Sequence, residues 1–180
     1  GGGQDWSIVF ELAMKSPGNN PMSRSVTFKG NPLTLVGDEV QVGQSAPDFE
    51  LTNGSLEAVT LADLQGKPTL ISVVPSLDTP VCQVQTKRFN EEIAAIGDQI
   101  NAVTVSLDLP FAQGRFCEGE GVENMQSLSD YKDRSFGTNW GILIDELKLL
   151  ARGVFVLDAQ GTVVHAETVA EVVDEPDYRS

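Results

Sequence analysis

The chain has 180 residues, of which 41% are hydrophobic and 21% are charged, and its formal net charge is -14 at pH 7. This composition is typical of one globular domain with a sizeable core. The negative charge argues against nucleic acid or an anionic membrane as a partner. Apolar runs are shorter than the roughly 20 residues that cross a bilayer. The first residues also lack the pattern of a secretory signal, so a cytoplasmic location is expected.

The chain contains two cysteines, Cys82 and Cys117, and one histidine, His165. The cysteines are too far apart in sequence for a CxxC redox motif or a zinc ribbon, which disfavours a general disulfide reductase. A single histidine gives little basis for a metal site or for His-dependent nucleophilic catalysis. We therefore expect no metal and no cofactor, and we expect His165 to lie on a hairpin face without a catalytic role.

The first residues differ in character from the rest of the chain. Three leading glycines and a Pro-Gly-Asn-Asn-Pro spacer are typical of an added or grafted arm. Apolar residues between them recur at helical spacing: Trp6, Val9, Phe10 and Met14. That spacing predicts a short helix, which would be stable only when docked. The expected organisation is an arm, a domain and two added residues, at 1–21, 22–178 and 179–180.

From residue 22 onward, short strands alternate with helices. Strands are predicted, in chain order, at 25–29, 33–36, 49–52, 69–74, 100–107, 154–157 and 162–167. Helices are predicted at 61–64, from Pro80 to a stop at Gly97, and at 111–116. The first two strands form a hairpin around Gly30-Asn31-Pro32, and the last two form another. This order predicts the α/β class, with a mixed central sheet flanked by helices on both faces and an extra N-terminal β-hairpin.

Further predictions concern local detail. The apolar side of the long helix is expected to consist of Val81, Val84, Phe89, Ile93 and Ile96. Gly119 and Gly121 indicate a mobile linker, and residues 135–138 read as a loop. An acidic cluster is expected to be solvated, because no twelve-residue calcium loop pattern fits it. Its members are Glu118, Glu120, Glu123 and Asp130.

The most informative stretch runs from Pro75 to Cys82. Thr79 is a favourable N-cap residue and Pro80 suits the first helical position, so Cys82 is expected at the third. A thiol there faces unpaired backbone N–H groups and the positive end of the helix dipole, which favour the reactive thiolate. The alternative is a buried, inert cysteine. Asp78 would oppose the thiolate, so a cation is needed nearby.

Pro75, Thr79 and Cys82 form the pattern P-x-x-x-T-x-x-C, which resembles the active-site motif of peroxiredoxins. The longer string SLDTPVCQVQTKRFN, which begins at Ser76, is similar to the atypical two-cysteine thiol peroxidases of bacteria. Four later strings agree in order: VSLDLPFAQGRFC, LSDYKDRSFG, LLARGVFVLD and EVVDEPDY. The resemblance covers residues 22–178 and implies a thioredoxin-like fold.

The resemblance also implies a thioredoxin-dependent peroxidase with an antioxidant role. Cys82 would be the peroxidatic residue and Cys117 the resolving residue, which form an intrachain disulfide that thioredoxin reduces. Thr79 and Arg152, the latter in the LLAR string, would orient the peroxide. Pro75 would exclude solvent. Hydrogen peroxide and alkyl or lipid hydroperoxides are the implied substrates, and a homodimer is the implied assembly.

Several surrounding residues have open interpretations. An apolar rim for bulky hydroperoxides, or a dimer contact, is expected at Leu109, Pro110 and Phe111. Arg88, in the TKRFN string, could line the back of the site. A disulfide needs Cα atoms within about 7 Å, and two cysteines on separate helices seldom start that close. Local unwinding near 78–84 and 112–121 is therefore predicted.

Both ends depart from the family pattern. Family members usually continue past the EPDY-like string into a closing helix, whereas here only Arg179 and Ser180 follow. One hypothesis is that the N-terminal arm fills the groove of that helix. The alternative function is a peroxiredoxin body that serves as an inert carrier for the N-terminal peptide. The presence of the complete residue set disfavours the carrier: Thr79, Cys82, Cys117 and Arg152.

Overall fold

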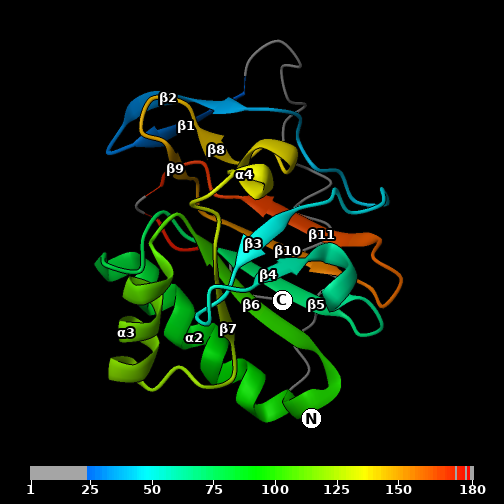
Figure 1. Ribbon diagram of the computed structural model, residues 1–180. Coiled ribbons are helices and arrows are strands. Elements are labelled where there is room, and N and C mark those ends of the chain that lie inside the picture. Colours follow the sequence, from blue (N-terminus) through cyan, green and yellow to red (C-terminus); the bar gives the residue numbers. More distant parts are fainter. Residues whose placement is uncertain (1–23, 173, 177, 179–180) are drawn as a thin grey trace.

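The computed structural model describes residues 24–172, 174–176 and 178 (Figure 1). Its main sheet has the strand order β11-β10-β5-β6-β7-β3-β4. These strands are β3 (Glu50–Thr52), β4 (Ala58–Thr60), β5 (Thr69–Val73), β6 (Asn101–Ser106), β7 (Gln126–Ser129), β10 (Gly153–Leu157) and β11 (Val163–Thr168). The neighbours β5, β6 and β7 are parallel, and the remaining pairs are antiparallel. The predicted mixed sheet is confirmed.

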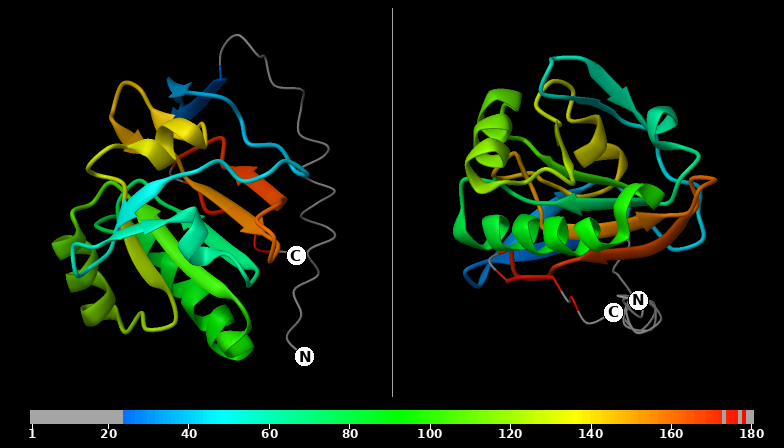
Figure 2. Two further views of the ribbon diagram at one scale, coloured as in Figure 1. Left: turned by 45° about the vertical axis from the view of Figure 1, so that its right-hand side comes forward. Right: turned by 90° about the horizontal axis from the view of Figure 1, so that it is seen from below.

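Helices cover both faces of this sheet. They are α2 (Pro80–Ile96), α3 (Pro110–Glu120) and α4 (Ser135–Asn139), with the 3-10 turns η1 (Leu61–Leu64) and η2 (Gly97–Gln99). The crossovers β5-α2-β6 and β6-α3-β7 step in the same direction along the sheet, so right-handed connections put both helices on one face. Lys87 of α2 pairs with Glu120 of α3 at 3.2 Å, and the two helices lie side by side in Figures 1 and 2.

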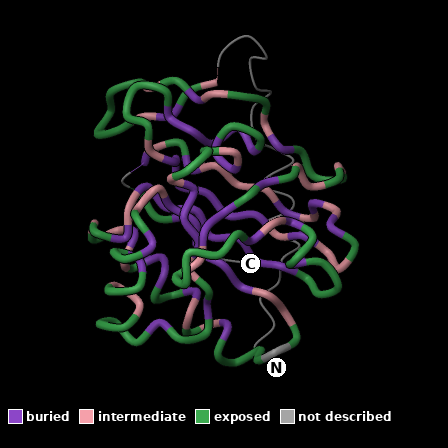
Figure 3. The backbone as a smooth tube through the Cα atoms, viewed as in Figure 1, coloured by how far each residue is buried: buried purple, intermediate pink, exposed green. Residues whose placement is uncertain are grey.

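Alternation along the strands separates two apolar cores. One core faces α2 and α3 and includes Leu70, Ala102 and Val154, together with Phe89 and Ile93 of α2. The other includes the intervening residues Ile71, Val103 and Phe155, together with Phe136 and Trp140 at α4. Figure 3 shows the buried backbone concentrated in the strands and the exposed backbone at the periphery. This period of two is what a sheet buried on both faces requires.

The N-terminal hairpin forms a second, smaller sheet. Its strands are β1 (Arg24–Phe28) and β2 (Asn31–Val36), joined by β8 (Leu143–Ile144) and β9 (Leu149–Leu150) in the order β1-β2-β8-β9. The turn lies at Lys29 and Gly30, which both have positive φ, 50° and 83°. It therefore begins before the predicted Gly-Asn-Pro position, because a two-residue turn with both φ values positive matches strand twist. The chain has a thioredoxin-like α/β fold with an added N-terminal hairpin, as predicted.

The loop predicted at 135–138 is wrong, because these residues belong to the short helix α4. The backbone N–H groups of Phe136 and Gly137 donate to the Asp130 carboxylate at 3.1 and 2.8 Å. Asp130 is only 1% exposed, so its assignment to a solvated acidic surface is also wrong. Burial raises the pKa of Asp130 to about 6. The other members of that cluster are exposed, as predicted: Glu118, Glu120 and Glu123.

The buried side of α2 agrees only in part with the predicted one, because Phe89 and Ile93 are buried as predicted whereas two other residues are not. Val84 and Ile96 are 49% and 37% exposed. The buried residues are Cys82, Gln85, Thr86, Phe89 and Ile93. They follow the i, i+3, i+4, i+7 spacing of one helical face. Hydrophobicity alone did not reveal the polar part of this face, where Gln85 is buried with hydrogen bonds to Ser72, Val73 and Arg152.

The linker predicted after Cys117 is also wrong. Helix α3 continues through Gly119 to Glu120, and Gly121 ends it in the left-handed conformation, with its N–H bonded to the Cys117 carbonyl. A glycine at that position is the usual helix stop. The predictions for the arm at 1–21 and for residues 179–180 lie outside the described residues. Within the described part of the chain, no helix is long and apolar enough to cross a membrane.

Candidate active site

The sharp turn between β5 and α2 places Cys82. Pro75 is buried just after the strand ends, and Pro80 starts the helix, where its missing N–H is not needed. Cys82 is the third helical residue, as predicted, and it is 0% exposed. Its apolar neighbours in the small cluster around it are Val74 and Leu77. The side chain therefore lies in a nearly dry pocket at the positive end of a helix.

Thr79 is the N-cap residue, in extended geometry, as predicted. Its hydroxyl does not accept from a helical N–H group. It donates instead to the carbonyl oxygen of Ser76 at 2.9 Å. This bond orients the hydroxyl within the loop before Cys82 and leaves its oxygen able to accept a hydrogen bond from another donor.

Arg152 lies against the sulfur. One guanidinium nitrogen, Nη2, donates to Sγ of Cys82 at 3.2 Å. Nη1 donates to Oε1 of Gln85 at 2.8 Å, and Nε donates to the carbonyl oxygen of Val172 at 2.9 Å. The residue is 2% exposed. Its fork is thus fixed on three sides, with one donor directed at the thiol.

The charge of Arg152 needs compensation at this depth. Among the described residues, the ion pairs are Lys87–Glu120, Arg88–Glu92 and Lys148–Asp145, and none of them involves Arg152. Its other two partners, an amide oxygen and a backbone carbonyl, are neutral. A buried cation without a carboxylate is costly unless an anion lies close to it. Among the three hydrogen-bonding partners of Arg152, the sulfur of Cys82 is the one atom that can carry a negative charge.

Gln85 belongs to this site although the sequence analysis did not select it. It is fully buried, and its Nε2 donates to Oγ of Ser72 at 2.8 Å and to the Val73 carbonyl at 3.3 Å. Its amide oxygen is thereby turned toward Arg152. Its position in the sequence could have indicated this role, because a residue three positions after Cys82 lies on the same face of the helix.

Asp108 is the other residue that the sequence analysis did not select. It follows β6 and accepts from Oγ of Ser76 at 2.7 Å and from the backbone N–H of Leu77 at 2.7 Å. These bonds attach the loop before Cys82 to the neighbouring strand. Asp108 belongs to the string VSLDLPFAQGRFC, but nothing in the neighbouring sequence indicates which groups its carboxylate contacts.

Cys117 occupies a different position. It is half-buried near the carboxyl end of α3, and both cysteines are free thiols. Burial raises the pKa of the Cys117 thiol, and a hydrogen bond with Ser127 partly offsets this. Phe116 packs against the cluster around Cys82 and also against the core that includes Cys117. The structure thus brings the two cysteines to the same face of the sheet, with Phe116 next to both clusters.

The remaining predicted site residues are scattered. Leu109 and Phe111 are 51% and 67% exposed, whereas Pro110 is buried as the first residue of α3. The guanidinium of Arg88 lies 4.5 Å from the ring centre of Tyr178 and pairs with Glu92 rather than with Cys82.

His165 is buried in β11, on the hairpin as predicted. Burial lowers its pKa to about 4, so the imidazole is neutral at pH 7.

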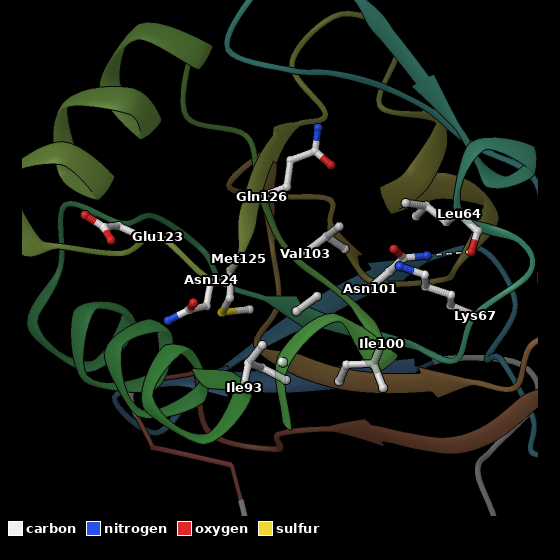
Figure 4. Close-up of a pocket in the computed structure, with 12 residues that line it drawn as sticks. Leu64, Lys67, Ile93, Ile100, Asn101, Val103, Glu123, Asn124, Met125 and Gln126 are labelled. Carbon is white, nitrogen blue, oxygen red and sulfur yellow. Dashed lines mark hydrogen bonds between the residues drawn. The ribbon is translucent and has the colours of Figure 1, made fainter. Parts of the chain in front are cut away.

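A cavity of about 520 Å³ lies at the opposite end of β6 (Figure 4). It is lined by the first residues of β6 and β7 and by the end of α2, including Asn101, Gln126, Ile93 and Lys67. None of the proposed catalytic side chains lines it. Within the described residues, no group of three or more His, Cys, Asp or Glu side chains could hold a metal ion.

Comparisons with known proteins agree with this geometry. The Redoxin family model matches residues 41–180. The thiol peroxidase of Bacillus subtilis (strain 168) is 56% identical over 153 residues, which are 85% of this chain and 91% of that protein. The thiol peroxidase of Listeria innocua is 52% identical over 155 residues, 86% of this chain and 93% of that protein. The chain therefore belongs to the Redoxin family and, within it, to the thiol peroxidases, which are peroxiredoxin-type enzymes.

Solved structures support the fold. A peroxiredoxin-like protein from Aquifex aeolicus superposes with a TM-score of 0.81 at 40% identity, covering 86% of this chain and 91% of that chain. The thiol peroxidase from Chromobacterium violaceum superposes with a TM-score of 0.78 at 22% identity, covering 86% and 90%, and shows the shared fold. The family and enzyme class expected from the sequence are confirmed. The alternative of an inert carrier has no support in these comparisons.

Proposed function

We propose that this chain reduces hydroperoxides by a two-cysteine cycle, with Cys82 as the attacking thiolate. The observation that carries this proposal is the 3.2 Å contact between Cys82 and the buried guanidinium of Arg152. That guanidinium has otherwise neutral partners, so the thiolate and the arginine stabilise each other. A nucleophile with a fixed cation beside it is the arrangement that displacement on a peroxide oxygen needs.

In the first step the Cys82 thiolate attacks the terminal oxygen of R–O–O–H. A sulfur–oxygen bond forms, the O–O bond breaks, and the alkoxide or hydroxide takes up a proton and leaves as alcohol or water. The sulfur loses two electrons and becomes a sulfenic acid. Arg152, the hydroxyl of Thr79 and the N–H groups of the first helical turn hold the two oxygens in line. Pro75 keeps the pocket narrow and dry.

In the second step the thiol of Cys117 attacks the sulfenic sulfur. A disulfide bond forms, the S–O bond breaks, and the departing hydroxide takes the thiol proton to leave as water. Because Cys82 is 0% exposed, the first turn of α2 must unwind before the sulfurs can meet. A dithiol of the thioredoxin type then supplies two electrons and restores both thiols.

The substrate range and setting follow the same proposal. Hydrogen peroxide needs only the pocket around Cys82. Organic hydroperoxides would place their apolar groups on the exposed side chains of Leu109 and Phe111, next to the start of α3. Pro110 is buried at the start of α3, between these two exposed residues in the sequence. Homodimerisation and a cytoplasmic location stay predictions.

A thiol titration tests this function. The reduced protein is mixed with one equivalent of cumene hydroperoxide, and free thiols are counted in the parent chain and in Cys117→Ser. The parent should lose two thiols, and the variant should carry a sulfenic acid at Cys82 that dimedone traps. If both thiols of the parent survive the peroxide, the proposed function is wrong.

A further inference from the structure

Asp108 connects the loop before Cys82 to the loop that starts α3. Its Oδ1 accepts a hydrogen bond from Oγ of Ser76 at 2.7 Å. Its Oδ2 accepts from the backbone N–H of Leu77 at 2.7 Å and from Oγ of Ser106 at 2.8 Å. A carboxylate that accepts three such bonds holds its partners more strongly than neutral groups do.

The same network reaches into α3. Oγ of Ser106 accepts from Nε2 of Gln113, a side chain of α3 that is 1% exposed, at 3.0 Å. Nε2 of Gln113 also donates to the carbonyl oxygen of Leu128 at 2.8 Å. The hydroxyl of Ser129 donates to the Asp108 carbonyl oxygen. A continuous chain of hydrogen bonds therefore joins the Cys82 loop to the helix that carries Cys117.

We propose that Asp108 is a positioning residue that sets the balance between the two steps of the cycle. It holds the side chain of Ser76 and the backbone N–H of Leu77, and through them the first turn of α2. That turn must stay in place for peroxide attack at Cys82 and must release for the disulfide with Cys117. The inference rests on the proposed function and adds a residue that acts through the loop, without contact to the peroxide.

The two steps should respond to loss of Asp108 in opposite directions. Peroxide attack depends on the placement of Cys82 against Arg152, which becomes less well ordered when the loop is freed. Disulfide formation depends on unwinding the same turn, which becomes easier. A residue with a merely structural role would slow both steps or leave both unchanged.

Single-turnover kinetics at pH 7 separate the steps. Sulfenic acid formation is followed in a Cys117→Ser background, and disulfide formation is followed in chains that contain both cysteines. Asp108→Ala should slow peroxide attack about tenfold and speed up disulfide formation about threefold. Asp108→Asn keeps an acceptor for the Leu77 N–H group and should restore part of both rates. Asp133→Asn, which removes an exposed carboxylate, is the charge-matched control.

Ser76→Ala provides a second route to the same test, because it removes the bond to Oδ1 of Asp108 and leaves the carboxylate in place, although the Asp78 N–H group also loses its acceptor. It should change both rates in the same directions as Asp108→Ala and by smaller factors. If thermal unfolding shows that Asp108→Ala does not fold, Ser76→Ala alone decides the test. The proposal is overturned if attack and resolution slow together in these variants, or if both stay at parent values. If the parent itself loses no thiols to peroxide, the proposed function fails, which is a distinct result.

Discussion

Cys82 and Cys117 lie in two regions of the molecule with opposite electrostatics. Cys82 is the third residue of α2, where the helix dipole is positive, and its sulfur accepts a bond from Arg152. Cys117 lies near the carboxyl end of α3, where the dipole is negative, and its carbonyl accepts the N–H of Gly121. Burial raises the pKa of Cys117, so it remains a thiol at neutral pH.

This contrast shows that depth alone does not decide reactivity. Cys82 is the more deeply buried of the two cysteines, and desolvation by itself disfavours a thiolate. What distinguishes Cys82 is the guanidinium of Arg152, which lies 3.2 Å from its sulfur. Cys117 is half-buried, without such a cation among the hydrogen-bond and ion-pair partners that the described residues provide. The proposed roles of Cys82 in attack and Cys117 in resolution rest on this difference in surroundings.

The largest expected effect comes from removing that cation. Arg152→Met should lower the second-order rate constant for peroxide by about three orders of magnitude, and Arg152→Lys by about two, because lysine cannot bridge Gln85 and Cys82 at once. Stopped-flow measurement of thiol oxidation gives these rates. Arg88→Met is the control, since Arg88 lies on the exposed side of α2.

The fold of the two Arg152 variants should survive. A buried cation replaced by an apolar side chain of similar volume often leaves stability unchanged. Thermal unfolding of Arg152→Met should therefore stay near the parent value. If this variant kept full activity, the thiolate would have to be supported by the backbone alone, and the contrast between the two cysteines would lose its main cause.

A smaller loss is expected when the neutral partner of Arg152 becomes charged. Gln85→Glu places a carboxylate beside the guanidinium, which then competes with the Cys82 thiolate for the same positive charge. The rate of peroxide attack should fall by about 30-fold. The thiolate absorbance at 240 nm and pH 7 should fall with it.

Gln83→Glu serves as the matched control for this charge. It adds one carboxylate to the same turn of α2, and Gln83 forms no side-chain hydrogen bond among the described residues. A loss of equal size in both variants would point to the general field of an added charge and against a specific role for Gln85.

Much of this site could be predicted from the sequence, and the reason is local. The position of Cys82 follows from Thr79 and Pro80, because an N-cap and a first-position proline fix the helix register within a few residues. The alternation of apolar residues likewise predicts the strands of the sheet. The family resemblance selected Arg152, and the structure places it 3.2 Å from the sulfur.

The residues that sequence reasoning missed act over long range. Gln85 is buried because it meets Arg152 from another part of the chain, and polarity alone assigns it to the surface. Asp130 was placed on the surface for the same reason, although two N–H groups of α4 satisfy it. Asp108 meets its loop partners only after β5 and β6 pair. Hydrophobic patterns cannot reveal such polar contacts, because each depends on tertiary structure.

The pH dependence of the two steps sharpens the contrast further. Burial raises the pKa of Cys117 above its ordinary value, so its thiolate fraction grows about tenfold for each pH unit below that pKa. The rate of disulfide formation should therefore rise by up to about tenfold for each pH unit between pH 7 and 9. Sulfenic acid formation in Cys117→Ser, measured over the same pH range, shows how much of the slope belongs to Cys117.

Ser127→Ala tests the cause of this slope. The hydrogen bond with Ser127 lowers the pKa of Cys117, so its loss should raise that pKa and slow resolution about threefold at pH 7.5. Peroxide attack at Cys82 should be unaffected. A resolution rate that does not change with pH, in the parent and in this variant, would show that removal of the Cys117 proton is not part of the slow step.

An effect as small as that of Ser127→Ala is expected at Phe116, which packs against the clusters of both cysteines. Phe116→Ala removes part of the packing that keeps the first turn of α2 and the end of α3 in place. Disulfide formation should speed up about threefold, because less packing is lost on unwinding. Since Phe116 is only half-buried, the free energy of unfolding should fall by about 2 kcal/mol, less than for a fully buried phenylalanine.

Phe111→Ala provides the matched truncation on the same helix. Phe111 is 67% exposed, so its loss should change the free energy of unfolding by less than about 0.5 kcal/mol and leave disulfide formation at the parent rate. Denaturant unfolding of the reduced chains and single-turnover kinetics give both quantities. If Phe116→Ala lost stability while its resolution rate stayed at the parent value, this aromatic contact would hold the core without restraining the cysteines. The energy barrier to unwinding before disulfide formation would then come from the hydrogen bonds of Asp108 and Arg152.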